Sequence, residues 1–328
     1  MPDRSLPSER GIALLTALMI VSMATIAAVA FTTRQKLSMR LTANILASDQ
    51  AYMYALGGEY WARGQLARDN EKDRKNGRMD SLDEDWAKPL PATAIESGTI
   101  EATLQDATAR FNLNNLYLPP KPDPKEQAMF NRQIAYFERL LDQLGIDAKI
   151  VQPVLDWIDG DIDARFPDGG EDVEYLNLDT PYRTANRRLI SITELRRIKG
   201  VTEGIYEKLA PYVTALPEST PLNINTADAV LIQALVNSAD TANVEALLEE
   251  RKEEPFRTKK EFLDRLKAAM NNKIQNPNDL EALIDVASVY FLARTDVQVD
   301  RIHMTLTSLI YKNPAGMPRT LIRSRGGL

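Results

Sequence analysis

Gly11–Phe31, GIALLTALMIVSMATIAAVAF, is a run of 21 residues without charge or proline, and it decides the fold of the first part of the chain. At a rise of about 1.5 Å per residue, roughly 20 apolar residues in a helix span the hydrocarbon layer of a bilayer. No proline occurs between Pro7 and Pro89, and apolar residues continue past the run in steps of four and seven, which is one stripe on a helix. The sequence therefore predicts one long N-terminal helix over residues 12–66, with residues 12–31 crossing a membrane. The stripe consists of Leu37, Leu41, Ile45, Tyr52, Leu56 and Tyr60.

Composition excludes several classes of protein. The chain has 328 residues, with 40 Lys and Arg, 46 Asp and Glu, one His and no Cys. Without cysteine there is no disulfide framework, thiol nucleophile or Cys-ligated metal, and a single histidine, His303, excludes a His-rich metal site. The net charge of −6 argues against bulk attraction to nucleic acid. No catalytic set of side chains stands out, so we do not expect an enzyme. Calcium, which binds oxygen ligands, remains compatible.

Three interpretations of the apolar run compete. A cleaved secretory signal has a shorter apolar core and a basic start, whereas the charges of Asp3, Arg4, Glu9 and Arg10 sum to zero. A plain single-span anchor does not require the helix to continue past the membrane. A prepilin-type leader is cut before a helix that is retained, and that helix packs first into a bundle and then onto its own globular head. The continuous pattern favours this third interpretation.

The rest of the chain predicts an α+β fold that a helical insertion interrupts. Gly98–Asp106 alternates apolar and polar residues as a strand does, and residues 287–328 return to a β pattern. The charged stretch Asp69–Asp85 predicts a solvated loop. Residues 119–286 are mostly helical and begin with a proline-rich break. We divide this insertion into two units, about 119–217 and 218–286.

Asp156–Asp179 is an acidic segment with the composition of a loop. Its 24 residues include nine carboxylates and a single base, Arg165. Crowded carboxylates repel one another unless a cation or solvent screens them, and calcium accepts about six to eight oxygen ligands. The stretch from Asp159 resembles the first half of an EF-hand, but Ala164 and Gly170 stand at its sixth and twelfth positions. The segment therefore predicts an irregular calcium site or, alternatively, a solvated acidic surface loop. The candidate ligands are Asp159, Asp161, Asp168, Glu171, Asp172 and Asp179.

Two tracts, Thr193–Val201 and Leu222–Ala227, resemble helix-hairpin-helix or SAM-like modules. Some such modules bind DNA phosphates through hairpin amides and nearby basic residues. Here Gly200 is present, but Thr202 stands where a second hairpin glycine would be. The alternative function is thus a membrane-anchored helix-hairpin-helix protein that binds nucleic acid in a type IV pilus-like or competence system. We instead expect a structural helical fold for protein contacts and no nucleic-acid partner.

The leader carries a more specific resemblance. Glu9-Arg10-Gly11-Ile12-Ala13-Leu14-Leu15-Thr16 resembles a type IV prepilin signal. With four further tracts, it makes nearly the full chain similar to the general secretion pathway protein K family, the large minor pseudopilins of type II secretion. Those tracts are Arg110–Asn114, Leu155–Asp159, Pro181–Asn186 and Pro221–Ala227.

This resemblance implies a maturation step, a location and partners. A prepilin peptidase removes the leader 1–11 by cutting between Gly11 and Ile12, and Ile12 becomes N-methylated. The protein lies in the bacterial inner membrane with its head in the periplasm. It assembles with minor pseudopilins I and J and other pseudopilins into a tip that initiates the pseudopilus and limits its length during export across the outer membrane. The family also implies calcium in the insert and a pseudopilin domain with an antiparallel sheet, formed by residues 67–118 and 287–328.

Thr16 departs from the usual pattern of pseudopilins. The fifth mature residue is glutamate in most of them, and the resemblance implies that its carboxylate pairs with the N-terminal amine of a neighbouring subunit. Such a pair fixes docking strongly, because an unpaired charge buried among apolar helices is very unfavourable. Thr16 offers no carboxylate, which suits a subunit with no other subunit above it. We therefore expect Thr16 to determine the tip position; the alternative is a tolerated small polar residue in a membrane helix.

Overall fold

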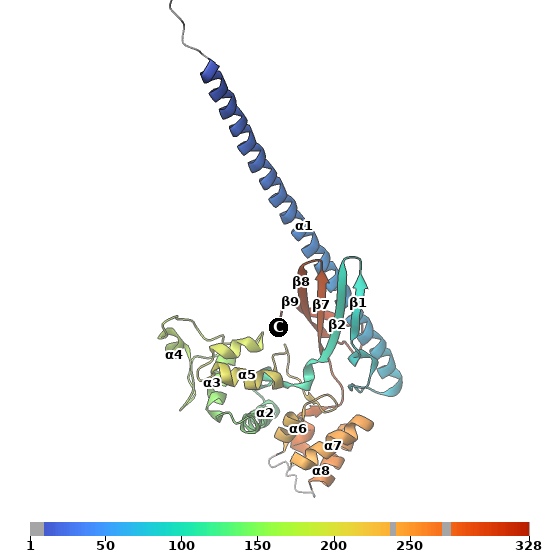
Figure 1. Ribbon diagram of the computed structural model, residues 1–328. Coiled ribbons are helices and arrows are strands. Elements are labelled where there is room, and N and C mark those ends of the chain that lie inside the picture. The colour runs from blue at the N-terminus through green and yellow to red at the C-terminus, as the bar shows by residue number, and fades with distance from the viewer. Residues whose placement is uncertain (1–9, 237–240, 271–276, 328) are drawn as a thin grey trace, which may run out of the picture.

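The computed structural model describes residues 10–236, 241–270 and 277–327, so most of the predicted leader 1–11 lies outside the described residues. The architecture is α+β, as predicted. A long N-terminal helix packs on an antiparallel sheet, and a helical insert interrupts that sheet (Figure 1). The first half of the helix projects away from the head.

The N-terminal helix, α1 (Arg10–Asn76), is continuous and extends past the predicted end at residue 66. The first part of the charged stretch, expected to be a solvated loop, is therefore helical. It stays helical because Asp69 and Asp73 turn toward the head and are buried there. Gly77 follows the helix with a positive φ of 93°, and its amide donates to the carbonyl oxygen of Asp73. This is the usual way in which a glycine ends a helix.

The sheet comprises β1 (Leu90–Ile95), β2 (Gly98–Asp106), β7 (Tyr290–Val299), β8 (Ile302–Tyr311) and β9 (Arg319–Arg325). Its strands are antiparallel and neighbour one another in the order β1-β2-β7-β8-β9. β2 pairs with β7 along its full length, so that Asp106 at its end lies opposite Phe291. The insert therefore leaves the sheet and returns to it at one place.

Small residues bring α1 close to the sheet. Ala51 and Ala55 are fully buried against it. A Cβ added to Gly58 would lie 2.4 Å from Cγ2 of Thr295 on β7, whereas a Cβ added to Gly57 would meet nothing within 4 Å. The predicted apolar stripe packs on the sheet only in part, through the half-buried Tyr52 and Leu56. Its members with large exposed fractions, from 55% to 64%, are Leu37, Leu41, Ile45 and Tyr60.

The insert contains two helical units, and a short pair of parallel strands closes each of them. β3 (Phe111–Asn112) pairs with β4 (Val213–Thr214), and β5 (Leu222–Asn223) pairs with β6 (Ile284–Asp285). Buried residues of both units form one hydrophobic core, in which Phe111 stacks on Phe137. The first unit therefore begins near Phe111, earlier than the expected boundary at residue 119, because the proline-rich break only precedes its first long helix.

Helices make up most of the insert. The first unit contains α2 (Pro124–Gln143), α3 (Val151–Ile158), α4 (Asp172–Leu176) and α5 (Glu203–Leu209), and the second contains α6 (Ala229–Leu235), α7 (Thr241–Glu253), α8 (Lys259–Ala269) and α9 (Pro277–Glu281). Short 3-10 helices cover Asp85–Ala87, Ala107–Ala109, Leu113–Leu116, Ala148–Ile150, Ile192–Arg197 and Ala210–Tyr212.

Candidate functional site

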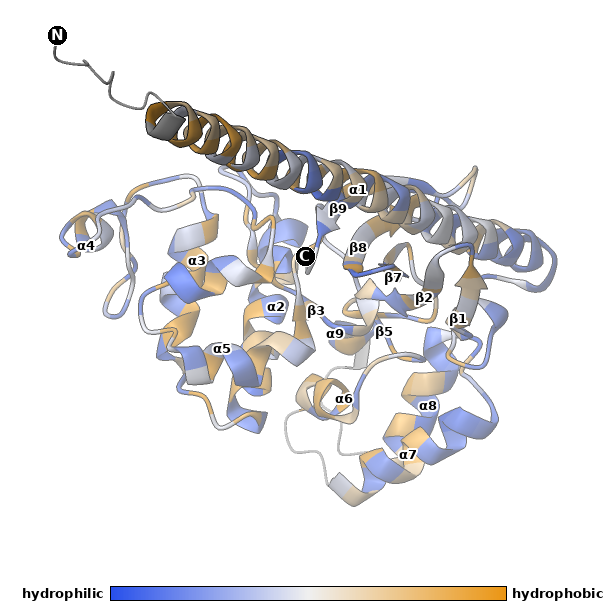
Figure 2. Ribbon diagram, turned by 45° about the horizontal axis from the view of Figure 1, so that its top comes forward, coloured by the Kyte–Doolittle hydropathy of each residue, from blue (hydrophilic) through white to orange (hydrophobic). Residues whose placement is uncertain are grey.

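The first part of α1 is apolar on all sides (Figure 2). Every side chain from Ile12 to Leu46 is exposed, and α1 is long and apolar enough to cross a membrane. An apolar surface of this size is rare on water-soluble monomers, so the helix fits a single-pass anchor. Gly11 and Ile12, between which cleavage is predicted, lie in the first turn of α1.

Thr16 satisfies its own hydroxyl within the helix. Its Oγ1 donates to the carbonyl oxygens of Ile12 at 3.1 Å and Ala13 at 3.0 Å. Ser22 and Thr25 bond in the same way to the carbonyl oxygens four residues before them. Such bonds let a hydroxyl lie in an apolar layer without an outside partner. Thr16 therefore offers neighbouring chains neither a charge nor an unsatisfied polar group.

The acidic segment folds around a fully buried carboxylate, that of Asp156 on α3. Asp156 accepts hydrogen bonds from the backbone amides of Arg165 at 3.1 Å and Gly170 at 2.8 Å. The guanidinium of Arg165 pairs with Asp156 at 2.6 Å and also contacts Asp159. A Cβ on Gly169 would lie 2.3 Å from Asp156 Oδ2, so a side chain at this position would open the loop. The single base of the segment thus ties the middle of the loop to its start.

Three of the six predicted ligands lie together. Asp159, Asp161 and Glu171, hereafter the Asp159 site, each have a carboxylate oxygen within 4.8 Å of the other two. Oxygens that bind one calcium ion at about 2.4 Å lie up to about 4.8 Å apart, so the spacing suits a single ion. Two buried oxygens of the site, Asp159 Oδ1 and Glu171 Oε1, have no hydrogen-bond partner within the described parts of the chain.

Electrostatics point to the same chemistry at the Asp159 site. Burial, reinforced by repulsion from Asp159, raises the pKa of Glu171 to about 7. Burial also raises the pKa of Asp159, although Arg165 opposes this rise. Both shifts mean that the folded protein disfavours the full negative charge of the site. A donor set made only of oxygen, with unsatisfied buried atoms and excess negative charge, fits a hard cation such as calcium.

The other three predicted ligands do not join the Asp159 site. Asp172 is engaged elsewhere, since its carboxylate pairs with Arg183 at 2.7 Å and accepts a bond from the amide of Thr184 at 3.1 Å. Asp168 is half-buried and Asp179 is exposed. The EF-hand-like stretch therefore contains two of the three clustered carboxylates, and Glu171 reaches them from the far end of the loop.

Basic residues near the hairpin tract are engaged within the insert. Arg196 pairs with Glu203 at 2.6 Å, and Lys199 Nζ donates to the carbonyl oxygen of Gly169 at 2.7 Å. Arg197 lies over the ring of Tyr182. These contacts give the basic cluster a structural role, which weakens the nucleic-acid alternative.

A buried lysine forms a second charged centre that the sequence analysis did not identify. Lys312, directly after β8, contacts Asp69 through Nζ, which also lies 2.8 Å from Asp73 Oδ2 and 2.6 Å from Asp80 Oδ1. The side chains of this Lys312 centre are at most 8% exposed. Burial opposes the lysine charge, but the carboxylates of Asp80 and Asp69 outweigh it and raise the pKa of Lys312. The three carboxylates are close enough to hold a metal ion, but the ammonium already supplies a cation to all of them.

The Lys312 centre continues into a polar network that joins the sheet to the insert. Asp80 Oδ2 accepts a bond from the amide of Ser288 at 2.7 Å, and the Asp80 carbonyl accepts one from the Asn223 side chain at 2.9 Å. Asn223 and Ser288 both donate to Asp106 Oδ2, at 3.0 and 2.5 Å. Asp106 ends β2 and Asn223 lies on β5 of the insert. The network therefore fixes how the insert is oriented on the sheet.

Comparison with known proteins identifies the family to which the chain belongs. Two family models, both described as type II secretion system protein K, match residues 109–218 and 222–285. The chain is 34% identical to the type II secretion system protein K of Pseudomonas aeruginosa over 325 residues, or 97% of this chain and 93% of the relative. The chain belongs to the type II secretion system protein K family, a family of minor pseudopilins. Protein K of Aeromonas hydrophila is 30% identical over 97% of this chain and 98% of its own length.

A solved protein K complex has the same fold. The chain matches a chain in the crystal structure of the GspK–GspI–GspJ complex from the enterotoxigenic Escherichia coli type 2 secretion system. The TM-score is 0.74 at 29% identity, and the match covers 88% of this chain and 99% of the other. The predicted family and fold class are therefore confirmed. Membership in the protein K family also makes the chain a structural component of a secretion system.

Proposed function

We propose that this minor pseudopilin lies at the tip of the type II secretion pseudopilus, where it initiates assembly and limits pseudopilus length. The observation that carries the proposal is the unbroken α1, which joins a membrane-length apolar segment to a head with a bulky insert. A subunit of this kind packs its apolar half among partner helices while its head stays outside the membrane. The resulting complex starts a filament that exports proteins across the outer membrane.

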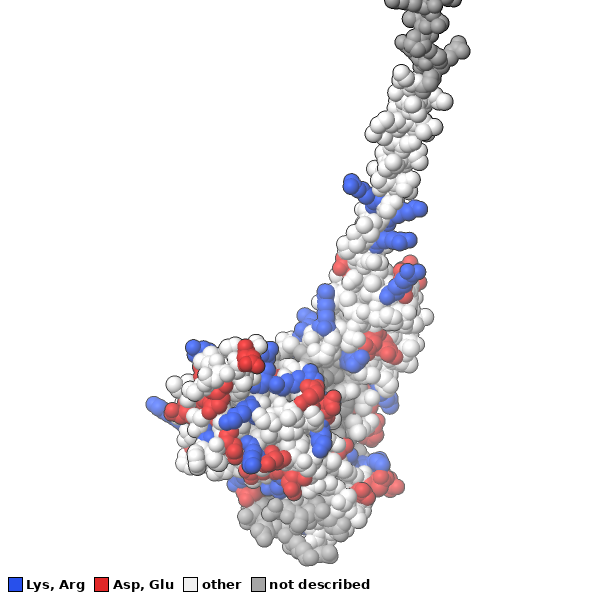
Figure 3. Space-filling model, turned by 60° about the vertical axis from the view of Figure 1, so that its left-hand side comes forward, with Lys and Arg blue, Asp and Glu red and all other residues white. Residues whose placement is uncertain are grey.

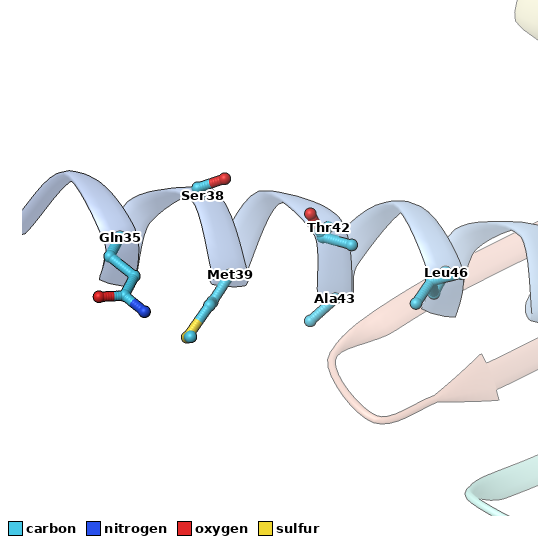
Figure 4. Close-up of a pocket in the computed structure, with 6 residues that line it drawn as sticks. All are labelled: Gln35, Ser38, Met39, Thr42, Ala43 and Leu46. Atoms are coloured by element: carbon cyan, nitrogen blue, oxygen red, sulfur yellow. The ribbon is translucent and has the colours of Figure 1, made fainter.

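Minor pseudopilins I and J are the proposed first partners, and the exposed part of α1 is the proposed contact. The related GspK chain was solved together with GspI and GspJ, which supports these partners. Ser38 and Ala43 are small enough for another helix to approach closely. They belong to an uncharged stripe with three- and four-residue spacing, which borders a shallow hollow of about 490 Å³ (Figure 4). The lining residues are Gln35, Ser38, Met39, Thr42, Ala43 and Leu46.

Two features support the tip position in particular. Thr16 bonds only within its own helix, so it has no charge for the terminal amine of a further subunit. The insert forms a large second lobe beside the sheet (Figure 1). In this proposal the missing charge removes the attraction for a subunit above, and the lobe excludes one by its volume.

Processing and location follow the family pattern in this proposal. A prepilin peptidase cuts between Gly11 and Ile12, and Ile12 is N-methylated. The mature chain then crosses the bacterial inner membrane once and carries its head in the periplasm. Mass spectrometry of the cellular protein tests this step: a methylated N-terminal Ile12 is expected, and an intact Met1 or a terminus beyond α1 would contradict it.

We also propose calcium as the ion of the Asp159 site. Carboxylate oxygens of Asp159, Asp161 and Glu171 would hold it, and the two unpartnered oxygens support that assignment. The bound ion supplies positive charge, which offsets repulsion among these carboxylates. The residues of the chain do the rest: Arg165 and Gly169 close the loop around Asp156 and so bring Asp159 and Glu171 together. The role of the site is to stabilise the insert.

An insert-deleted variant tests the tip function. Asp106 lies opposite Phe291 on neighbouring strands, so a short turn from Asp106 to Tyr290 can replace the insert and keep the sheet. We expect this variant to co-purify with pseudopilins I and J from membranes but to produce longer pseudopili than the parent. A Thr16→Glu variant, with Thr16→Ser as its matched control, tests the missing charge. Pseudopili of parental length from both the insert-deleted and the Thr16→Glu variants would refute the tip proposal.

A further inference from the structure

A group of basic residues lies on α1 immediately past its apolar segment. Arg34, Lys36 and Arg40, hereafter the basic collar, are all exposed. Figure 3 shows basic side chains gathered on the helix just beyond its uncharged first part. The next acidic residue along α1 is Asp49, and within the described ranges none of the three collar residues takes part in an ion pair. The collar therefore carries three positive charges without a counter-charge of its own.

The height of the collar places it at a membrane surface. At about 1.5 Å per residue, Arg34 lies roughly 5 Å beyond Phe31, Lys36 roughly 8 Å and Arg40 roughly 14 Å. The headgroup region adds roughly 5–8 Å to each side of the hydrocarbon layer. Arg34 and Lys36 thus lie within the headgroup region when residues 12–31 fill the hydrocarbon layer. The long side chain of Arg40 reaches back toward the same region.

The directions of the collar side chains favour a surrounding layer over a single partner helix. At 3.6 residues per turn, Lys36 and Arg40 point roughly 160° and 120° away from Arg34 in the same sense, so the three side chains spread over an arc of about 160° around the helix axis. The stripe through which a helix packs on one neighbour is about 100° wide, so a single partner helix contacts only part of this arc. Lipid headgroups surround a membrane helix on every side that partner helices leave free.

Membrane orientation does not explain the collar. Basic residues are usually enriched on the cytoplasmic flank of a membrane helix. Two, Arg4 and Arg10, precede the apolar segment, whereas the three collar residues follow it on the side of the head. Cleavage after Gly11 would leave only the collar. Basic residues are therefore more numerous on the head side, which is opposite to the distribution expected for a head in the periplasm. The orientation of the chain in the membrane thus does not account for the collar, whereas a negatively charged ligand does.

We propose that the basic collar binds the phosphate groups of anionic phospholipids on the head side of the membrane and thereby fixes the depth of the subunit before assembly. The inference rests on the membrane-spanning role proposed above. Each Lys or Arg near an anionic surface strengthens the attraction by about fivefold at moderate ionic strength. Salt weakens this attraction, because the charges are exposed to solvent.

The experiment uses the full chain in phosphatidylcholine nanodiscs with trace amounts of labelled lipid. Since the chain has no cysteine, Ser38→Cys gives a single attachment point for a fluorescent donor beside the collar. Energy transfer to acyl-labelled phosphatidylglycerol is compared with transfer to acyl-labelled phosphatidylcholine. We expect at least about fivefold preference for phosphatidylglycerol in the parent, which decreases in high salt.

Two charge-removal variants make the test specific. R34Q/K36Q/R40Q should lose the lipid preference. R74Q/K75Q/R78Q removes three exposed basic residues at the other end of α1 and should keep it. Equal transfer to both lipids in the parent, or equal loss in both variants, would overturn the proposal; in that case protection of the collar by added pseudopilins would identify a protein ligand instead. Failure of the parent to enter nanodiscs would refute the membrane span and not the collar alone.

Discussion

Replacement of Lys312 by methionine removes the cation from a charged cluster that is buried between α1 and the sheet. Lys312→Met leaves the carboxylates of Asp69, Asp73 and Asp80 facing one another with side chains at most 8% exposed. Removal of one partner from a buried ion pair typically destabilises a protein by about 3–5 kcal/mol. That loss is a large share of the roughly 5–15 kcal/mol that separates most folded proteins from their unfolded state. We therefore expect Lys312→Met to lower the free energy of unfolding by at least about 3 kcal/mol.

Urea unfolding of the full chain in detergent measures this loss. The fluorescence of Trp86 reports on the surroundings of Lys312. The ring of Trp86 packs against that of Phe291 with their centres 4.9 Å apart, and Lys312 Nζ lies 5.8 Å from the centre of the Phe291 ring. The unfolding midpoint should fall by more than about 1 M urea. Lys72→Met is the matched control, since this lysine also pairs with an aspartate, Asp85, but is exposed. The control should leave the midpoint nearly unchanged.

The loss should also depend on pH in a defined direction. Burial already raises the pKa of Asp80 well above its usual range in the presence of Lys312. Without the lysine charge, the folded-state pKa of Asp80 rises further, so the folded variant binds more protons than its unfolded chain. Its stability then falls as pH rises. The difference between parent and variant should be larger at pH 8 than at pH 5.

Two results would refute this account. One is a Lys312→Met variant as stable as the parent at pH 8. The other is stabilisation of the parent by divalent cations that disappears in Asp73→Asn, because it would mean that the carboxylates hold a metal and not the lysine. The triple variant D69N/D73N/K312M should recover most of the lost stability, since it removes the repulsion together with the cation.

Three further predictions test the helix, its buried glutamate and the calcium proposal. Gly58→Ala should lower the melting temperature, because the added Cβ would lie 2.4 Å from Thr295. Gly57→Ala should raise the free energy of unfolding by up to about 1 kcal/mol, because its Cβ meets nothing within 4 Å and alanine favours the helix. Shifts of the melting temperature in the same direction for both variants would contradict this prediction. Burial raises the pKa of Glu59, but hydrogen bonds from Arg323 outweigh this effect and lower it. The parent should therefore lose stability as pH falls below about 4.5, and Glu59→Gln should lose less stability in the same acid unfolding series. Asp159→Asn should weaken calcium binding at least about tenfold in titration calorimetry, and Asp179→Asn should not; equal affinities would exclude the Asp159 site.

Local patterns explain which parts of the fold were predictable. The apolar run, the absence of proline and the alternation in β2 are all signals within short windows, and they predicted the long helix and the α+β order. The face of α1 that packs on the sheet was not predictable in this way. Ala51, Ala55 and Gly58 face the sheet because small residues permit close approach, yet they carry little hydrophobic signal. The larger residues of the apolar stripe were the stronger signal, yet four of the six are exposed, and only Tyr52 and Leu56 pack against the sheet.

The Asp159 site could be predicted from the sequence and the Lys312 centre could not, because only the Asp159 site contains residues that are close together in the chain. Asp159 and Asp161 stand close together in an acidic segment with EF-hand-like spacing, so composition alone made them candidates. The Lys312 centre brings Asp69 and Asp80 to a residue more than two hundred positions later in the chain. Lysine and aspartate are almost never fully buried unless they are paired, and only the closed sheet brings these partners together.

The position of the Lys312 centre bears on how a length-limiting cap can work. Asp69 and Asp73 belong to α1, Asp80 to the connection after it, and Asn223 to the insert. Any tilt of the insert relative to α1 would separate Asp80 from Lys312 or from Asn223, which is unfavourable for buried groups. The insert is thus held at a fixed angle to the helix that the proposed function places in the filament. A flexibly attached insert would move aside and admit another subunit, so the cap proposal requires a rigid joint of this kind. Lys312→Met should accordingly lengthen pseudopili at temperatures at which the variant still co-purifies with pseudopilins I and J. Pseudopili of parental length under those conditions would show that the rigidity of this joint does not limit pseudopilus length.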